Sequence, residues 1–296
     1  MVAEGLQRIL VTGAGGLLGS KLVTRARRYF NVVSTYRTES LFPNSVRMDI
    51  TKQAEVRRIF NSFKPDVVIH AAAETNVDRC EVDKERAWRV NVGGTKNIAD
   101  MSNVINARML YVSTDYVFSG EQGLYTERDD PNPVNHYGST KLEGERYIIR
   151  HCRDYAIART SVLYGHHPSK SNFVKWVIKT LEEDEPISVV DDHYNSPTLA
   201  SNLAEAILEM IQKNLDGLYH TAGSGRINRF DFALQIAKTF DLDSNLIKPV
   251  RMSELRAWVA MRPRDSSLRT DKIKKQIKTK LLDVNDGLKR MKRAAA

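Results

Sequence analysis

A glycine-rich turn near the start of the chain limits what it can fold into more than any other feature. Glycine recurs at positions 13, 16 and 19, directly after the apolar run 8–12 and around the start of an amphipathic stretch at 17–28. Glycines at this spacing, between a first strand and a first helix, are typical of dinucleotide-binding α/β folds. They permit a tight bend and a close approach of backbone to a pyrophosphate, and the helix N-terminus then faces the phosphates. We therefore expect a dinucleotide to lie against Gly13, Gly16, Leu17, Leu18 and Gly19.

Strands and helices alternate along the first half of the chain. Apolar runs predict strands at 8–12, 32–36, 46–49, 66–70, 109–113 and 156–160, and longer stretches predict helices at 17–28, 53–63, 84–104 and 137–150. This rhythm predicts an α/β protein with a doubly wound parallel sheet, an NAD(P)-binding Rossmann fold. The alternation breaks after about residue 165. We expect the Rossmann domain over 1–165 and a smaller mixed α/β substrate lobe over 166–296, with some segments returning to the Rossmann domain.

The lengths of the apolar runs and the number of cysteines argue against several other classes of protein. No apolar run is long enough to cross a bilayer, and the N-terminus lacks the features of a signal peptide. The two cysteines, Cys80 and Cys152, belong to no metal-binding pattern. We expect a cytoplasmic protein with buried thiols, no membrane association and no metal site.

The net charge of +9 comes largely from basic residues late in the chain, between Lys272 and Arg293. Such a cluster could bind nucleic acid, but no aromatic residue stands among these lysines and no nucleic-acid motif is present. We favour a solvated helix face on a protein that takes an anionic small molecule, with no nucleic-acid partner.

The residues after the second and third strands bear on the type of dinucleotide. A second strand that ends in an acidic residue is usual where the ribose 2′-hydroxyl of NAD is bound, whereas this one is followed by Arg37. Because Arg37 could pair with a 2′-phosphate, we expect NADP(H) to be preferred, with NAD(H) as the alternative. Asp49 and Ile50 lie where an adenine amino group could be contacted, although Asp49 could equally belong to a turn or cap the helix that follows.

Tyr137 and Lys141 stand four residues apart on one expected helix, so they share a face. Free tyrosine has a pKa near 10, and a neighbouring ammonium lowers it towards neutrality, where the hydroxyl can exchange protons. The strand before this helix ends at Thr114, whose hydroxyl could bond a reacting oxygen. The three residues together predict acid–base chemistry beside the dinucleotide.

These motifs resemble those of the extended short-chain dehydrogenases/reductases. Within that group they most resemble the dTDP-4-dehydrorhamnose reductases, with the regulatory β subunit of methionine adenosyltransferase as a relative. The matching segments are 11–19, 65–73, 113–118, 137–141 and 262–263. The resemblance implies an NAD(P)H-dependent oxidoreductase that reduces the 4-keto group of a nucleotide-linked deoxy sugar. It also implies that Tyr137 donates the proton, Lys141 holds the nicotinamide ribose and Thr114 orients the substrate oxygen.

Further residues take expected roles from the same resemblance. Asn91 matches a structural and proton-relay asparagine, and could otherwise be an ordinary helix residue. Small residues that let the backbone approach the nucleotide are expected at Ala71, Ala72 and Ala73. Residues expected to contact the substrate are Asn172, Phe173 and Arg262, and Arg262 could meet a diphosphate. Phe173 as a core residue and Arg262 as a surface charge are the structural alternatives.

Three departures from the family bear on the activity. Tyr116 stands where nucleotide-sugar dehydratases carry a catalytic glutamate, so elimination lacks its base. Val162 stands where the reductases often carry tryptophan, and the acidic C-terminal cluster that binds a metal in some relatives is missing. The alternatives to a reductase are an NADP(H)-binding regulatory subunit without turnover and a nucleotide-sugar epimerase. A nucleotide-diphosphate sugar is the expected partner, and a homodimer is expected by analogy with proteins of this fold.

Overall fold

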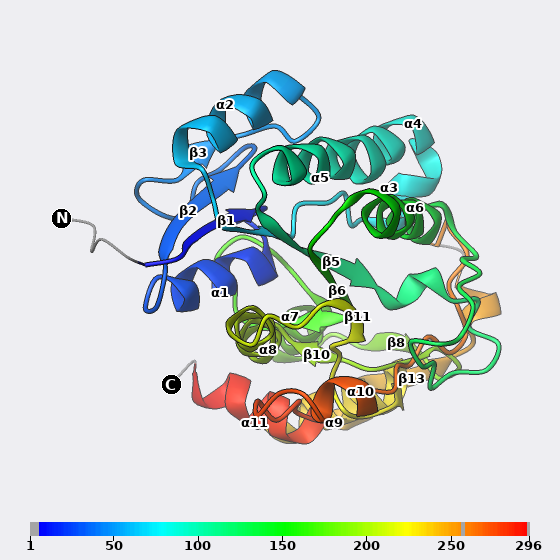
Figure 1. Ribbon diagram of the computed structural model, residues 1–296. Coiled ribbons are helices and arrows are strands. Elements are labelled where there is room, and N and C mark those ends of the chain that lie inside the picture. Colours follow the sequence, from blue (N-terminus) through cyan, green and yellow to red (C-terminus); the bar gives the residue numbers. More distant parts are fainter. Residues whose placement is uncertain (1–5, 256–257, 295–296) are drawn as a thin grey trace.

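The central sheet joins the strands that the sequence predicts and adds one from much later in the chain. The computed structural model describes residues 6–255 and 258–294. Within them, seven parallel strands lie in the order β11-β6-β5-β4-β1-β2-β3 (Figure 1). Their bounds are β1 Arg8–Thr12, β2 Asn31–Tyr36, β3 Val46–Arg47, β4 Val67–His70, β5 Arg108–Thr114, β6 Tyr155–Thr160 and β11 Gly217–His220. The predicted doubly wound α/β fold is confirmed.

Helices cover both faces of this sheet, and each face forms its own apolar core. Because side chains alternate along a strand, Ile9 and Val11 of β1 point into one core and Leu10 into the other. The first core includes side chains of α1 Leu17–Ala26 and α8 Ala200–Gln212. The second includes side chains of α2 Gln53–Phe63, α5 Thr95–Val104 and α6 His136–His151.

The expected helix over 84–104 is interrupted. It consists of α4 Lys84–Trp88, a π-helical turn over Arg89–Gly94, and α5. A π-helical turn widens the helix and re-aims the side chains on it, and such turns are frequent at functional sites. This one carries Asn91. The short helix α3 Val77–Val82, just before α4, is also absent from the sequence prediction.

The later part of the chain builds short strand pairs and helices around a third core. The pairs are β7 Leu163–Tyr164 with β10 Thr198–Leu199, β8 Ile187–Val190 with β13 Ile247–Val250, and β9 Tyr194–Asn195 with β12 Ile227–Asn228. Helices α7 Phe173–Glu182, α9 Arg229–Phe240 and α11 Val284–Arg293 surround a core that includes Tyr164, Phe232 and Leu288. The small helix α10 Asp271–Lys274 precedes α11.

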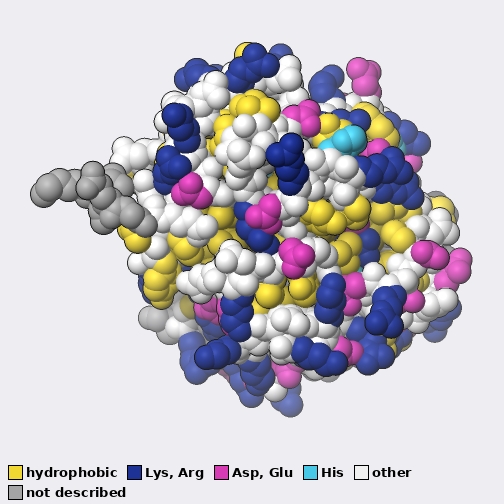
Figure 2. Space-filling view, viewed as in Figure 1, with side chains coloured by type: hydrophobic (Ala, Val, Ile, Leu, Met, Phe, Trp, Pro, Cys, Tyr) yellow, Lys and Arg dark blue, Asp and Glu magenta, His cyan; other side chains and the backbone are white. Residues whose placement is uncertain are grey.

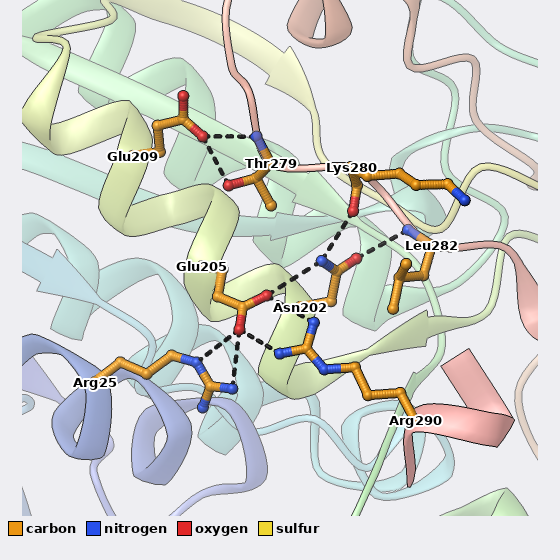
Figure 3. A network of polar contacts seen from close by, with 8 residues as sticks. All are labelled: Arg25, Asn202, Glu205, Glu209, Thr279, Lys280, Leu282 and Arg290. Atoms are coloured by element: carbon orange, nitrogen blue, oxygen red, sulfur yellow. Dashed lines mark hydrogen bonds and ion pairs between the residues drawn. The ribbon is translucent and has the colours of Figure 1, made fainter. Parts of the chain in front are cut away.

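Polar contacts tie the late segment back to the Rossmann helices (Figure 3). Glu205 of α8 accepts hydrogen bonds from Arg25 of α1 and from Arg290 of α11. One turn earlier, Asn202 donates to the carbonyl of Lys280 (3.0 Å) and accepts from the amide of Leu282 (2.9 Å). Helix α8 is thereby fixed between the first helix of the chain and its last segment.

Charged side chains are spread over the surface. Figure 2 shows Lys and Arg scattered across one face, with acidic and apolar side chains between them. Several late basic residues pair with carboxylates within the chain, including Lys280 with Asp286 (2.7 Å) and Lys292 with Asp241 (2.5 Å). Part of the late positive charge is therefore balanced locally. None of the described helices has the length and apolar character needed to span a membrane.

Candidate active site

The glycine turn packs against the backbone that follows β4. Gly13 has φ +72°, and a Cβ there would lie 2.8 Å from the backbone nitrogen of Ala72, so only glycine fits. Helix α1 starts at Leu17, and Gly16 before it has no side chain with which to cap the helix. The first amides of a helix have no partner within it, so an acceptor such as a phosphate can satisfy them. The half-buried Ala71 and Ala72 lie beside this turn, and Ala73, also half-buried, follows them. The arrangement fits a dinucleotide.

The buried side chain of His70 connects the strands and helix beneath the glycine turn. The ring of His70 lies 2.8 Å from Thr12 Oγ1 through Nδ1 and 3.1 Å from Thr95 Oγ1 through Nε2. Burial lowers the pKa of His70 to about 3, so the ring is neutral, with one nitrogen as donor and the other as acceptor. Thr12 also accepts from the amide of Ala72 (3.2 Å). The network links the end of β1, the end of β4 and the start of α5.

Asn91 bridges three segments and is more than an ordinary helix residue. Its side chain accepts from the amide of Glu74 (2.8 Å) and donates to the carbonyl of the same residue (3.1 Å). It also donates to Thr140 Oγ1 (3.0 Å), and Thr140 in turn donates to the carbonyl of Tyr137 (2.7 Å). With 1% of its surface exposed, Asn91 holds the loop after β4 to the start of α6. A role in proton relay stays a prediction.

Tyr137 and Thr114 are brought together by the start of α6. Asn135 caps this helix by accepting from the amide of Gly138 (2.8 Å). A Cβ at Gly138 would collide with the carbonyl oxygen of Tyr116, so the helix packs directly on the short 3-10 turn Asp115–Val117 that follows β5. The rings of Tyr137 and Tyr116 meet edge to face with centroids 6.1 Å apart. Thr114 acts on Tyr137 as a hydrogen-bond partner and lowers its pKa.

The expected lowering of the Tyr137 pKa by Lys141 is not found. Burial raises the pKa of Tyr137 above its ordinary value, and the contact with the Thr114 side chain offsets only part of that shift. Lys141 instead donates to the carbonyl of Val112 (2.8 Å) and lies 4.0 Å from the centre of the Tyr111 ring. Burial lowers the pKa of Lys141 to about 7, against the opposing charge of Glu145. The two groups therefore share a helix face, as predicted, but each titrates according to its own burial.

Asp115, which sequence reasoning did not assign, organises the polar groups around Thr114. Its buried carboxylate accepts from Ser161 Oγ (2.7 Å) and Ser266 Oγ (2.5 Å) through one oxygen and from Thr114 Oγ1 (3.1 Å) through the other. Burial raises the pKa of Asp115, and these hydrogen bonds oppose the shift. Three segments far apart in sequence thus meet at one carboxyl group.

The residues expected to recognise the adenosine end lie in different settings. Arg37 is exposed at the end of β2, free to reach a ligand. Asp49 accepts from the amide (2.9 Å) and hydroxyl (2.8 Å) of Thr51, which is the turn arrangement given above as its alternative. Ile50 belongs to the buried core on one face of the sheet, and its carbonyl accepts from Asn97 (2.8 Å).

The three expected substrate residues are not gathered into one cluster of mutual contacts. Asn172 caps α7 and donates to the carbonyl of Gly165 (2.8 Å). Phe173 packs against Phe232 with centroids 5.5 Å apart. Arg262 pairs with Asp78 through both guanidinium nitrogens of its fork (2.7 and 3.1 Å). Each of these side chains already makes a contact within the protein, whether or not it also binds a ligand.

Sequence reasoning missed Arg229, at the start of α9. Its guanidinium lies 4.7 Å from the centre of the Phe173 ring and makes no hydrogen bond or ion pair with any described residue. Burial lowers its pKa, and the charges that act on it include Asp115 and Arg262. Arg262 in turn lies over the ring of Trp258 (5.0 Å). A half-buried arginine with no partner among the described residues could pair with an anion, and no local sequence pattern marks it.

The two cysteines lie inside the protein and apart from any metal-ligating group of the described residues. Cys80 and Cys152 are buried free thiols, as expected, and burial raises their pKa values to about 12 and about 11. Over residues 6–255 and 258–294 no group of three metal-ligating side chains comes together.

Known proteins resemble this chain over nearly its whole length. The family of the RmlD substrate binding domain matches residues 7–296. The dTDP-4-dehydrorhamnose reductase of Aggregatibacter actinomycetemcomitans is 35% identical over 238 residues, 78% of each chain. The dTDP-4-dehydrorhamnose reductase of Bacillus anthracis, solved in complex with NADP, has a TM-score of 0.89 and 32% identity over 98% of this chain and 99% of its own. Methionine adenosyltransferase 2 subunit beta of Mus musculus is 29% identical over 276 residues, 90% of this chain and 81% of its own. The resemblance noted in the motifs is confirmed.

Proposed function

The chain belongs to the family of the RmlD substrate binding domain, and we propose that it reduces the 4-keto group of a nucleotide-linked deoxy sugar with hydride from NADPH. The observation that carries the proposal is Tyr137 and Lys141 on one face of α6, with Thr114 beside Tyr137, in a fold whose glycine turn fits a dinucleotide. In open α/β sheets ligands bind outside the carboxyl ends of the strands, and β5 ends at Thr114.

The residues divide the chemistry of a reduction between them. When bound, the cofactor would supply the hydride for the carbonyl carbon, and Tyr137 would give its hydroxyl proton to the carbonyl oxygen. A raised pKa suits Tyr137 to this direction, because it keeps the proton in place until the oxygen becomes basic. Lys141 would hold the nicotinamide ribose, and Thr114, oriented by Asp115, would position the substrate oxygen.

We propose NADP(H) as the preferred cofactor, with NAD(H) as the weaker alternative. The exposed guanidinium of Arg37, at the end of β2, can pair with the 2′-phosphate that distinguishes the two. The pyrophosphate would lie against the amides from Gly13 to Gly19, and Ala71, Ala72 and Ala73 would line the other side of the nucleotide. Asp49 and Ile50 would lie by the adenine, Asp49 through whichever oxygen Thr51 leaves free.

The substrate diphosphate would be held by arginines of the later part of the chain. Arg229 has no carboxylate partner among the described residues, whereas Arg262 already pairs with Asp78. We therefore assign Arg229 the larger share of the binding, with Arg262 beside it. Phe173 would fix the plane of Arg229 by stacking, and Asn172 would act by holding the start of α7.

The wider assignments follow from the same proposal. Residues 1–165 would form the cofactor domain and 166–296 the substrate lobe, with α8 and β11 returning to the first. The enzyme would act in the cytoplasm as a homodimer, without a metal ion, and its partner would be the nucleotide sugar rather than nucleic acid.

The decisive experiment follows NADPH oxidation with an enzymatically generated dTDP-4-keto-6-deoxy sugar. Tyr137→Phe removes the proton donor and keeps the ring, so turnover should fall by at least about 100-fold, the usual contribution of a general acid. Tyr147→Phe is the matched control, because this tyrosine lies on the same helix and bonds only Asp100 (2.7 Å) near the surface. Equal turnover in wild type and Tyr137→Phe would refute the assigned role.

A second candidate is a regulatory subunit that binds NADP(H) without turnover. The similarity to methionine adenosyltransferase 2 subunit beta favours it, as does Val162 at the position where the reductases often carry tryptophan. NADPH binding without reduction of any keto sugar, together with co-purification of a methionine adenosyltransferase catalytic chain, would support this candidate over the reductase. Cofactor that stays bound through purification would point instead to an epimerase.

A further inference from the structure

Residues 165–170, here called the strap, run from the end of β7 across the start of α1. The α-carbon of Gly165 faces Leu17, the first residue of α1: a Cβ there would lie 3.9 Å from Leu17 Cδ1. The strap is held from behind, because Asn172 donates to the carbonyl of Gly165 (2.8 Å). Lys175 donates to the carbonyl of His167 (2.9 Å). The strap is thus fixed over the end of α1 where the phosphates of a dinucleotide would bind.

His167, in the middle of the strap, has a donor without a partner. Only 4% of the residue is exposed. Its Nδ1 accepts from the amides of Ser169 (3.2 Å) and Lys170 (2.9 Å), so in the neutral ring the hydrogen must be on Nε2. Nε2 is buried and makes no hydrogen bond with any residue in 6–255 or 258–294. A buried unpaired N–H is costly, so a bound acceptor would stabilise this arrangement.

The surroundings of His167 point to an anionic acceptor. The backbone of Gly15, inside the glycine turn, raises the pKa of the ring as an acceptor does, although no hydrogen bond of normal geometry forms, so the ring N–H faces the glycine turn. Lys21 of α1, Lys170 of the strap and Lys175 of α7 all act on the ring with positive charge. The uncapped start of α1 and the unpaired imidazole N–H therefore lie at the same glycine turn, in a region of positive charge. A phosphate has only acceptor oxygens and negative charge, and it satisfies all of these groups together.

We propose that Nε2–H of His167 donates a hydrogen bond to the pyrophosphate of the bound dinucleotide, so that the strap adds a cofactor ligand from outside the glycine turn. The inference rests on the cofactor placement in the proposed function. It gives Asn172 a different task from the one expected, since Asn172 positions the strap and through it the cofactor. The strap also links the lobe that holds the sugar to the phosphates of the hydride donor.

The test is calorimetric titration of the full-length protein with NADPH and with NADH. His167→Phe keeps the ring volume and removes the donor, so we expect Kd to rise roughly 10- to 100-fold, the loss of one hydrogen bond to a charged group. The rise should be the same for both cofactors, because both carry the pyrophosphate. His166→Phe is the matched control: its ring bonds the carbonyl of Met291 (2.9 Å), away from the glycine turn, and both Kd values should stay unchanged.

Two amide variants keep the test valid if His167→Phe does not fold. His167→Gln can place a donor near the position of Nε2, whereas His167→Asn reaches only the position of Nδ1. The Gln variant should therefore bind both cofactors more tightly than the Asn variant. Three results would each overturn the inference. The His167→Phe variant could keep wild-type affinity, it could lose affinity for NADPH only, or the wild-type protein could bind neither cofactor. A loss confined to NADPH would place the ring at the 2′-phosphate. The titration contains no sugar, so it tests cofactor binding only. A protein that binds the cofactor but does not turn over the keto sugar in the separate assay would count against the proposed function alone.

Discussion

Glu145, on the helix that also carries Tyr137 and Lys141, forms an ion pair inside the protein with Arg159 of β6. The two residues are 1% and 3% exposed, and two hydrogen bonds of 2.9 and 2.6 Å join the guanidinium of β6 to the carboxylate of α6. The third guanidinium nitrogen, Nη1, has no partner among the described residues. The charge on Glu145 also raises the pKa of Lys141 one turn earlier on the helix, opposing its burial. The pair therefore supports the position of the helix that carries Tyr137 and the charge of Lys141.

Replacing Glu145 with Gln removes this charge with little change in size. Arg159 is then buried with no counter-charge, and removing one partner of a buried pair costs about 3–5 kcal/mol. For a chain of 296 residues the entropy of unfolding near 60 °C is about 0.6 kcal/mol per kelvin. The unfolding temperature of Glu145→Gln should therefore fall by about 5–8 °C.

Scanning calorimetry of the two proteins without cofactor measures this fall. Glu143→Gln is the control, since its carboxylate is 30% exposed and lies 3.9 Å from Arg146 on the same helix. Exposed pairs contribute about 0–1 kcal/mol, so this change should move the transition by less than about 2 °C. A double replacement of Glu145 and Arg159 by Met should recover most of the lost stability, because no charge is left buried. Equal transitions for Glu145→Gln and its control would refute the argument that desolvation of Arg159 sets the cost.

Three further predictions follow from single contacts. Arg229→Leu should raise the KM for the keto sugar by about tenfold or more, as expected for a lost charge-assisted contact, and should leave the Kd for NADPH unchanged. Steady-state kinetics and a separate NADPH titration would check these two values. The pKa of Lys141 is about 7 in the folded protein and about 10.5 in the unfolded chain, so the unfolded chain binds more protons between those values. Stability without cofactor should therefore gain up to about 1.4 kcal/mol per pH unit from pH 7 to 10 relative to Lys141→Met, and urea unfolding at several pH values would disprove this if the two slopes agree. Asn91→Ala leaves the amide and carbonyl of Glu74 without their partner, so urea unfolding should show a loss of about 2–3 kcal/mol, and a loss below about 0.5 kcal/mol would contradict the bridging role.

The parts of the fold that the sequence predicts are those encoded by neighbouring residues. The run at 8–12 is apolar throughout because β1 is covered on both faces, and that pattern is visible without the structure. The glycine turn is equally local, since the φ of Gly13 and its contact with Ala72 both demand a residue without a side chain. The spacing of Tyr137 and Lys141 predicts their common helix face for the same reason.

Titration behaviour is harder to predict because it depends on what covers a group. Tyr137 and Lys141 lie on the predicted helix, but the shifts in their pKa values come first from burial, which spacing along a helix does not reveal. The carboxyl of Asp115 is another case. Its hydroxyl partners Ser161 and Ser266 come from segments 46 and 151 residues away, so no local pattern could have identified the cluster.

Helix α8 shows how the fold pairs charged residues whose role the composition alone does not reveal. Apolar residues on more than one side of α8 indicate burial, but the pattern does not say against which partner. In the structure, Glu205 meets Arg25 from 180 residues earlier and Arg290 from 85 residues later. The carboxylate of Glu209 likewise accepts from the amide (2.8 Å) and hydroxyl (2.7 Å) of Thr279. A late basic residue that could suggest a nucleic-acid site is therefore also a counter-charge for an acidic helix of the first core. Pairing with Glu205 is favoured over nucleic-acid binding, because Arg290 is already ordered against this carboxylate. An external polyanion would have to displace Glu205 before it could bind Arg290.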